Sequence, residues 1–390
     1  MIVKRIKLHN WKNFQSCEVD LTDRCFIIGA NASGKSNFID ALRFLRDIAK
    51  QSGGLQTAIE ERGGLTKIRC LAARAQTNIA ITVELGNPEE KENIWKYHLD
   101  FSQTGGGVIK KQVKINKEEV YSYSEKKYVL KRSNSDEKED EEMLKYTHLE
   151  QATANRKFRE LQMFFQNIEY LNVIPQMIRE SSSVVTSLTK EDYYGRNFLE
   201  KLAKMNERTR NSYFRKINEC LKIAVPQLEE LQFVKDNMGI PHLEARYKHW
   251  RSKGSKQQET QFSDGTLRLV GFLFALLDSH GVILLEEPEI NLHSGIVSQI
   301  PIFVSKIQRT KKIKSQILIT THSYDMLSDT SISTDEVLIL QNTAEGTKVQ
   351  TLTDLSELKA VVDAGLTIAD AVIPATKPKE IEKLSQLSIF

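Results

Sequence analysis

The segment Gly29–Ser36 constrains this chain more than any other stretch of its sequence. Its residues, Gly-Ala-Asn-Ala-Ser-Gly-Lys-Ser, match the pattern G-x-x-x-x-G-K-[ST] without a mismatch. The apolar run Cys25–Ile28 precedes it and an amphipathic stretch to about Lys50 follows, which predicts a buried strand, a tight loop and a helix. Such a loop lets backbone N–H groups curl around phosphates, and the start of the helix attracts the same anion. The pattern therefore predicts a nucleotide site.

The residue types in this loop also predict which groups bind the nucleotide and a Mg²⁺ ion. Lys35 can reach the β- and γ-phosphates, and the Ser36 hydroxyl can reach the metal ion. Glycine at both ends removes the Cβ atoms that would prevent so tight a curl. The other nucleotide-binding residues predicted here are Gly29, Asn31, Ser33, Gly34 and Asn37.

Length and composition describe an ordinary globular protein. The chain has 390 residues, 40% of them hydrophobic, enough for a large core and two or three domains. Its four cysteines form no C-x-x-C pair, so neither a zinc site nor a disulfide framework is indicated, and a reducing cytosol fits best. No apolar run approaches the length of a membrane span. A net charge of +4 is too small to demonstrate a polyanionic partner.

Hydrophobic periodicity divides the chain into strand-like and helical stretches. From about His148 to Pro226 apolar residues recur every three to four positions, which predicts a short, compact helical block. Two runs, Val282–Leu285 and Ile313–Thr320, are apolar enough to be buried central strands, and they predict a doubly wound sheet. Alternation predicts strands at 2–9, 17–21 and within 228–262, and an antiparallel meander at 68–74, 78–85, 94–101, 108–115 and 119–131.

Three further motifs end or begin elements at the expected edge of that sheet. Glu286 and Glu287 follow the run Val282–Leu285, where one carboxylate can hold Mg²⁺, through water, and the next can polarise an attacking water. Ser263, with Gly265 two residues on, opens a helix and offers an anion-receptive N-terminus, although alone it is an ordinary N-cap. His322 ends the other strand, where a lone histidine is usually structural.

Together the four motifs resemble the Walker A, signature, Walker B and switch-histidine motifs of the ABC-type ATPases, in that family's order. The opening Ile6–Phe14, Asn37 and the block Glu286–His293 resemble the RecF, structural-maintenance and OLD branch rather than membrane transporters. The fold class implied is α/β, an ABC-type P-loop ATPase head with a mixed sheet, plus an inserted antiparallel meander and a short helical arm. The implied domains are a discontinuous head (1–90 and 228–350), the insertion (91–227) and a C-terminal helical tail (351–390).

The resemblance implies a role for each motif. Glu287 would be the catalytic base, Glu286 would support the metal and His322 would sense the γ-phosphate. Ser263 and Gly265 would contact the nucleotide of a second copy, so that ATP joins two heads. Asp264, Thr266, Glu286 and His293 depart from the transporter pattern, which weakens only that comparison. The family's metal-contacting glutamine has three candidates, Gln56, Gln76 and Gln166.

Three functions stay open from the sequence. The first is an ATP-hydrolysing homodimer that regulates a separately encoded effector, a nuclease or toxin, in bacterial anti-phage defence, as in RloA-type and abortive-infection ATPases. The chain contains no D-x-D pair, so a nuclease within it is not expected, and Glu357-x-Lys359 is a chance echo of a restriction site. The second is a DNA-repair or chromosome-type ATPase that contacts DNA or RNA through Arg246–Lys256. The third is a scaffold with little turnover.

Overall fold

The computed structural model divides the chain into two compact units, which are described separately. The first comprises Met1–Glu169, His280–Leu284 and Lys311–Phe390, and the second comprises Tyr170–Ser279 and Leu285–Thr310. The structure describes residues 1–74, 77–104, 112–135, 141–180, 195, 197–250, 255–310 and 315–377. Gln76, part of the basic segment Arg246–Lys256 and the Gly-rich loop near residue 105 lie wholly or partly outside the described residues.

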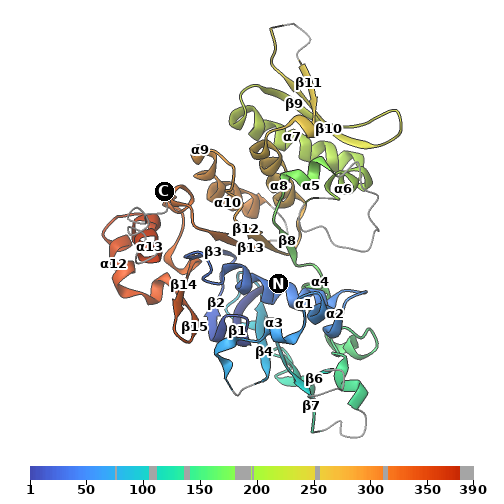
Figure 1. Ribbon diagram of the computed structural model, residues 1–390, viewed down its shortest axis with the longest axis vertical. Coiled ribbons are helices and arrows are strands. Elements are labelled where there is room, and N and C mark those ends of the chain that lie inside the picture. Colours follow the sequence, from blue (N-terminus) through green and yellow to red (C-terminus); the bar gives the residue numbers. More distant parts are fainter. Residues whose placement is uncertain are drawn as a thin grey trace, which may run out of the picture. The chain divides into compact units, whose positions relative to one another are not determined.

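An antiparallel sheet forms one layer of the first unit (Figure 1). Alternation of buried and exposed positions along its strands gives it one core-facing side, as in β4, where every second residue is buried. The face packs on α1 (Lys35–Ala49), because the Phe44 ring lies 5.1 Å from Trp11 and 5.5 Å from Phe101. Its order is β2-β1-β4-β5-β6-β7, with bounds β1 Ile2–Trp11, β2 Phe14–Asp20, β4 Ile79–Gly86, β5 Asn93–Thr104, β6 Gln112–Ser122 and β7 Lys127–Ser133.

The predicted antiparallel arrangement is confirmed, but two of the predicted strands are wrong. Residues 68–74 are not a strand, because α3 (Leu65–Ile68) and the 3-10 turn Leu71–Ala73 occupy them and leave Leu71 exposed. The last hairpin turns between Ser122 and Lys127, later than predicted, since β6 continues through the polar residues that suggested a break. Lys117 and Glu119 in that stretch pair with each other on the surface, so charged side chains accompany a regular strand.

The second sheet holds the central strands. β13 and β14 flank β3 and both run parallel to it, so the three strands end at one edge. β3 and β13 are buried along their whole lengths, as expected for near-continuous apolar runs. Its order is β15-β14-β3-β13-β12-β8, with bounds β15 Gly346–Thr351, β14 Val337–Thr343, β3 Arg24–Gly29, β13 Gln316–Thr321, β12 Val282–Glu286 and β8 Glu169–Leu171. A mixed sheet is therefore confirmed.

Short helices complete the first unit. α1 contacts both β3 and β13 of the central sheet, and it also covers the antiparallel sheet, so it lies between the two layers. The C-terminal helices α12 and α13 pack together (Figure 1), and α13 also contacts α11. The bounds are α2 Leu55–Glu60, α4 Arg159–Gln166, α11 Tyr324–Leu327, α12 Ser356–Asp363 and α13 Ile368–Thr376. Both α12 and α13 lie within the tail predicted from residue 351, whose boundary stays a prediction.

The second unit joins helices to a three-stranded antiparallel sheet. α8 forms its core, because ten of its side chains between Thr266 and Leu276, and the intervening Gly271, are buried. α7 lies along β9 (Figure 1). The helical block predicted at 148–226 is interrupted by β8, which is short and therefore easily absorbed into flanking helical periodicity. The bounds are α5 Pro175–Arg179, α6 Phe198–Lys204, α7 Glu207–Ala224, β9 Leu228–Lys235, β10 Pro241–Tyr247, β11 Ser255–Gln258, α8 Asp264–Asp278, α9 Ser294–Val297 and α10 Ile300–Thr310.

Across the described ranges, the helices lack the combination of length and apolar character that crossing a membrane requires. The predicted domain boundaries at 90 and 228 stay a prediction.

Candidate functional site

The loop Gly29–Ser36 joins β3 to α1, and both of its glycines are required by their surroundings. Gly34 has a φ of 97°, and a Cβ there would lie 1.9 Å from the Asn13 amide nitrogen. At Gly29 a Cβ would lie 2.4 Å from the Ser33 hydroxyl oxygen and 2.7 Å from the Leu340 carbonyl oxygen. The first glycine is thus fixed by close approach and the second by both backbone conformation and close approach.

Lys35 lies over the start of this loop. Its Nζ donates to the carbonyl oxygens of Gly29, at 3.0 Å, and Ala30, at 3.3 Å, and the side chain is largely buried. Asn31 and Ser36 are exposed. Among the described residues no side chain caps the N-terminus of α1, so its first-turn N–H groups are oriented for an anion.

Asn13 ties the loop to the neighbouring hairpin. Its amide nitrogen donates to the Ser33 carbonyl at 3.0 Å, and its oxygen accepts from Asn37 at 2.9 Å. Thr347 donates to the same Ser33 carbonyl at 2.9 Å, and the Trp11 indole donates to the Asn37 carbonyl at 2.8 Å. Asn37 therefore helps to hold the loop through its hydrogen bonds with Asn13 and Trp11. Asn13 was not predicted as a site residue, although it lies in the opening segment that carries the family resemblance.

The switch histidine is placed beside this loop by strand register. Thr321, the last residue of β13, pairs with Ile28 in the parallel β3, so His322 lies level with Gly29. His322 is exposed, and the Ser323 hydroxyl accepts from the backbone N–H of Met326 to cap α11. The first unit therefore brings His322 and the phosphate loop to one sheet edge.

A buried ionic cluster supports α1 below the loop. Arg62 donates to both oxygens of Asp40, at 2.9 and 3.0 Å, and to Asp47 at 2.8 Å. Burial alone would raise the pKa of Asp47, but the charges of Arg46, Arg62 and Lys50 lower that pKa to about 2. Burial would also raise the pKa of Asp40. The charges of Arg62 and Lys12 outweigh this effect, so the pKa of Asp40 is lowered. These carboxylates are thus charged parts of the scaffold.

The signature residues lie in the second unit. Ser263 is exposed at the N-cap of α8, where its hydroxyl accepts from the Thr266 backbone N–H at 3.1 Å. A Cβ at Gly265 would lie 2.6 Å from the Asn291 carbonyl oxygen, so glycine is required for the helix start to approach the loop after β12. Arg179 pairs with Asp264 at 2.5 Å and holds this start from the other side.

Glu286 and Glu287 end β12 in the same unit. Glu287 has a φ of 41°, in the left-handed region that non-glycine residues seldom occupy and that clusters at functional sites. Tyr170, in β8, donates its hydroxyl to the Glu286 carboxylate. Burial lowers the pKa of Arg268, and the charges of Asp264, Glu289 and Glu287 act against that change. Tyr170 was missed by the sequence reading because β8 was taken as part of a helical block.

The residues present fit a triphosphate with Mg²⁺. The Ser33 hydroxyl is buried and finds no hydrogen-bond partner in the described part of the chain, which suits a phosphate oxygen. No group of three or more His, Cys, Asp or Glu side chains within the described ranges could hold a metal alone. Mg²⁺ generally takes one or two carboxylates together with water and phosphate oxygens. The Ser36 hydroxyl, at the end of the phosphate loop, is a donor that can complete such a set.

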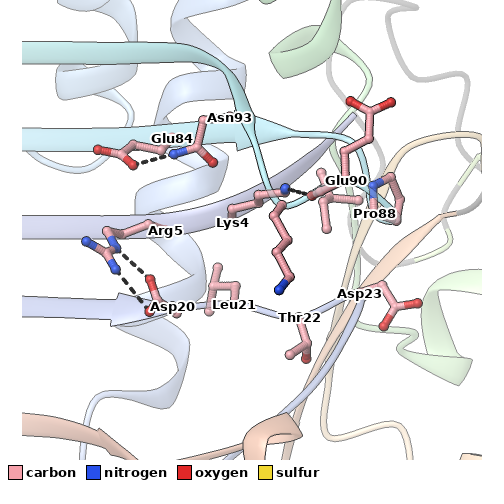
Figure 2. A pocket seen from close by; sticks show the side chains of 12 residues that line it. Lys4, Arg5, Asp20, Leu21, Thr22, Asp23, Glu84, Pro88, Glu90 and Asn93 are labelled. Carbon is pink, nitrogen blue, oxygen red and sulfur yellow. Dashed lines mark hydrogen bonds and ion pairs between the residues drawn. The ribbon is translucent and has the colours of Figure 1, made fainter. Parts of the chain in front are cut away.

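The pocket in Figure 2 lies at the opposite end of β3 from the phosphate loop. Its volume is about 550 Å³, and Asp23, just before β3, lines it. Its charges are already matched, because Arg5 pairs with Asp20 at 2.5 Å and Lys4 donates to the Glu90 and Glu92 carbonyls. It is therefore a surface hollow separate from the phosphate loop.

Comparisons with known proteins agree with this geometry. Residues 25–328 match a family described as "AAA domain, putative AbiEii toxin, Type IV TA system", which is more than half of the chain. The chain belongs to this family. Residues 3–46 also match the P-loop containing region of AAA domains. No curated protein matches. The chain is thus a P-loop ATPase domain, in a family whose description names a putative AbiEii toxin and a type IV TA system.

One solved structure shows the same fold, and two others are similar to a lesser degree. An Smc head bound to the C-terminal winged-helix domain of ScpA matches with a TM-score of 0.52 at 13% identity, covering 91% of this chain and all of the other. An Smc head derived from Pyrococcus furiosus, bound to the C-terminal domain of ScpA, gives 0.49 at 12% identity, covering 93% and 99%. The head from Thermotoga maritima gives 0.44 at 12%, covering 90% and 99%. The predicted fold class is confirmed.

The glutamine candidates lie elsewhere in structural roles. Gln56 donates to the carbonyls of Val113 and Lys145, and Gln166 accepts from Gln162 at the end of α4. Gln76 lies outside the described residues. The identity of the metal-contacting glutamine stays a prediction.

Proposed function

We propose that this protein binds and hydrolyses ATP with Mg²⁺ and dimerises around two nucleotides. The observation that carries the proposal is the formed phosphate loop, with Lys35 held over Gly29 and Ala30 and an uncapped α1 N-terminus beside it. Lys35 and the loop N–H groups would bind the phosphates, and Ser36 and Glu286 would hold the metal, which neutralises charge developing on the phosphates. Asn31, Ser33 and Gly34 would shape the cradle.

Two residues would carry the chemistry. Glu287 would take a proton from the attacking water, and its left-handed backbone holds its side chain away from the direction that β12 would otherwise impose. His322, level with Gly29, would contact the γ-phosphate and so distinguish ATP from ADP.

The dimer would use the signature end of each copy on the other's nucleotide. Exposure of Ser263 supports this, because a hydroxyl buried in its own core could not reach a neighbour. Dimerisation would then regulate a separately encoded effector, a nuclease or toxin, in a bacterial anti-phage system. The family description supports the toxin-linked setting.

Direct action on nucleic acid receives less support. Arg246 in the basic segment pairs with Glu229 at 3.0 Å and Glu230 at 3.3 Å, and Lys256 pairs with Glu244 at 2.8 Å. Trp250 is 82% exposed and suits base stacking, but Arg246 and Lys256, at the two ends of the segment, are engaged with acids. DNA or RNA binding therefore stays a prediction, and the contacts described for this segment do not favour it.

Replacing Glu287 with Gln tests the proposed hydrolysis. The substitution keeps the shape of the side chain and removes its basicity, so turnover should fall by about 10²–10⁴-fold while ATP binding persists. Phosphate release measures the first and light scattering after size exclusion measures accumulated dimer. The matched control Glu357→Gln, at an exposed position on α12, should keep full turnover. Full turnover in Glu287→Gln would remove this residue from its role.

A further inference from the structure

Tyr170 and Glu286 form a hydrogen bond across 116 positions of sequence. The phenol is 8% exposed, and it donates to one oxygen of a half-buried carboxylate at the end of β12. Both residues belong to the second unit. A hydrogen bond from a neutral donor to a charged acceptor is stronger than one between two neutral groups, and partial burial strengthens it further.

The backbone around Tyr170 is itself held in place. Val173, three residues later, packs on Gly271 of α8, where a Cβ would lie 3.0 Å from the valine methyl carbon. Further on, Arg179 donates to the Phe262 carbonyl at 2.7 Å and to Asp264 at 2.5 Å. The phenol is therefore presented to Glu286 from a segment anchored at two later points.

The Glu286 side chain has more rotational freedom than an aspartate would have at the end of this strand. A glutamate has one more rotatable bond than an aspartate, so its carboxylate sweeps a wider set of orientations. A metal bound through one such carboxylate and phosphate oxygens needs that carboxylate in one orientation, and groups that orient ligands from behind tune metal affinity. A fixed hydroxyl on one oxygen supplies that restriction.

We propose that Tyr170 is a positioning residue that orients the Glu286 carboxylate for Mg²⁺ bound with ATP. This inference rests on the proposed function of Glu286. The hydroxyl itself contacts neither metal nor nucleotide in this scheme; it acts through Glu286 alone. Glu286, which is longer than an aspartate, and the buried Tyr170 therefore act as one functional pair.

The test is the Mg²⁺ dependence of nucleotide binding by the full chain. A fluorescent ATP analogue is titrated with Mg²⁺ in the wild type and in Tyr170→Phe, which removes the hydroxyl and keeps the ring. The Mg²⁺ concentration for half-maximal binding should rise about tenfold, the lower end for loss of a group that orients a metal ligand. Binding of the analogue in EDTA should not change, since the hydroxyl does not contact it.

A matched control separates positioning from general destabilisation. Tyr97→Phe removes a hydroxyl that donates to another carboxylate, Glu118, at 3.0 Å within the antiparallel sheet. This control should leave the Mg²⁺ midpoint unchanged. An equal rise in both variants would overturn the inference, because it would show a nonspecific effect of losing a buried phenol.

A double-mutant cycle gives a second, independent outcome. In a Glu286→Gln background the charged ligand is gone, so adding Tyr170→Phe should not move the Mg²⁺ midpoint further. Additive shifts would overturn the inference. An unchanged midpoint in Tyr170→Phe alone would also overturn it while leaving ATP binding by the wild type intact. Failure of the wild type to bind the analogue with Mg²⁺ would instead overturn the proposed function, and the inference with it.

Discussion

α1 and α8 are both 15 residues long and both begin at a motif predicted to meet phosphate, yet their N-termini differ. α1 starts at Gly34, whose φ of 97° leaves the first N–H groups without a side-chain cap in the part of the chain described. α8 starts at Ser263, whose hydroxyl accepts from the Thr266 N–H. The first terminus is open to an anion. At the second, one backbone N–H already donates to the Ser263 hydroxyl, which is itself exposed.

The contacts that hold α1 and α8 in place also differ. α1 is fixed by charges, with Asp40 and Asp47 buried against Arg62. α8 is fixed by apolar burial along most of its length, from Leu267 to Leu276. Directional ion pairs set the orientation of a helix more narrowly than apolar contacts do, because hydrogen-bonded charges tolerate little displacement. We infer from this comparison that α1 is held in a fixed position to bind phosphate, whereas α8 offers its exposed N-terminus to a neighbouring copy.

The largest effect is expected at the open terminus. Lys35→Ala should lower turnover by about 10²–10³-fold, because a charge that stabilises the transferring phosphate is lost. Stabilisation of the fold by ATP and Mg²⁺ in a thermal melt should disappear with it. Phosphate release and melting with and without nucleotide measure the two effects.

Lys348→Ala, at an exposed position of β15, provides the control and should behave as wild type. Retained binding in Lys35→Ala would mean that the α1 terminus and the loop N–H groups suffice, and that the lysine is dispensable.

The next effect tests the charged support of α1. Arg62→Ala removes the partner that two buried carboxylates share. Because Lys12 still pairs with Asp40, and Arg46 and Lys50 with Asp47, the free energy of unfolding should fall by about 1.5–3 kcal/mol. Arg5→Ala removes an arginine paired with Asp20 at the surface, where both side chains are about half exposed, and should cost less than about 1 kcal/mol. Denaturant unfolding of both variants measures the contrast. Equal losses would show that burial of the cluster contributes nothing.

The same cluster predicts a pH dependence. The folded-state pKa of Asp47 is about 2, below the ordinary value of 3.8. Its contribution to stability is therefore complete above pH 4 and is lost as the pH falls from about 4 toward 2. In Arg62→Ala the pKa of Asp47 should lie higher, so acid unfolding followed by circular dichroism should begin at a higher pH than in the wild type.

How far the sequence predicted this molecule depended on how local each signal is. The phosphate loop, the buried strands and the helix starts were predicted because glycine spacing, apolar runs and Ser263 act within a few residues. β8 was missed because three residues carry no periodicity of their own. The stretch 68–74 looked alternating, yet the chain there is held by turns, and Leu71 lies outside the core.

The supporting residues could not be predicted for a different reason. Asn13 reaches Ser33 across 20 positions, and Tyr170 reaches Glu286 across 116. Such contacts follow from the packing of elements, which no local pattern contains. The sequence therefore identified the groups that would touch the nucleotide and left out those that would hold them.

The smallest effect on stability is expected at the capped terminus, and it sharpens the contrast between the helices most. Ser263→Ala removes one cap and should cost about 1 kcal/mol of unfolding free energy. Asn206→Ala removes the cap of α7 in the same unit, where the side chain accepts from Arg208 N–H, and should cost about as much. If Ser263 serves a neighbour's nucleotide, then in the Glu287→Gln background only Ser263→Ala should abolish the ATP-dependent dimer seen by light scattering. A dimer that survives Ser263→Ala would show that this hydroxyl is a helix cap and nothing more, and α8 would then resemble any other buried helix.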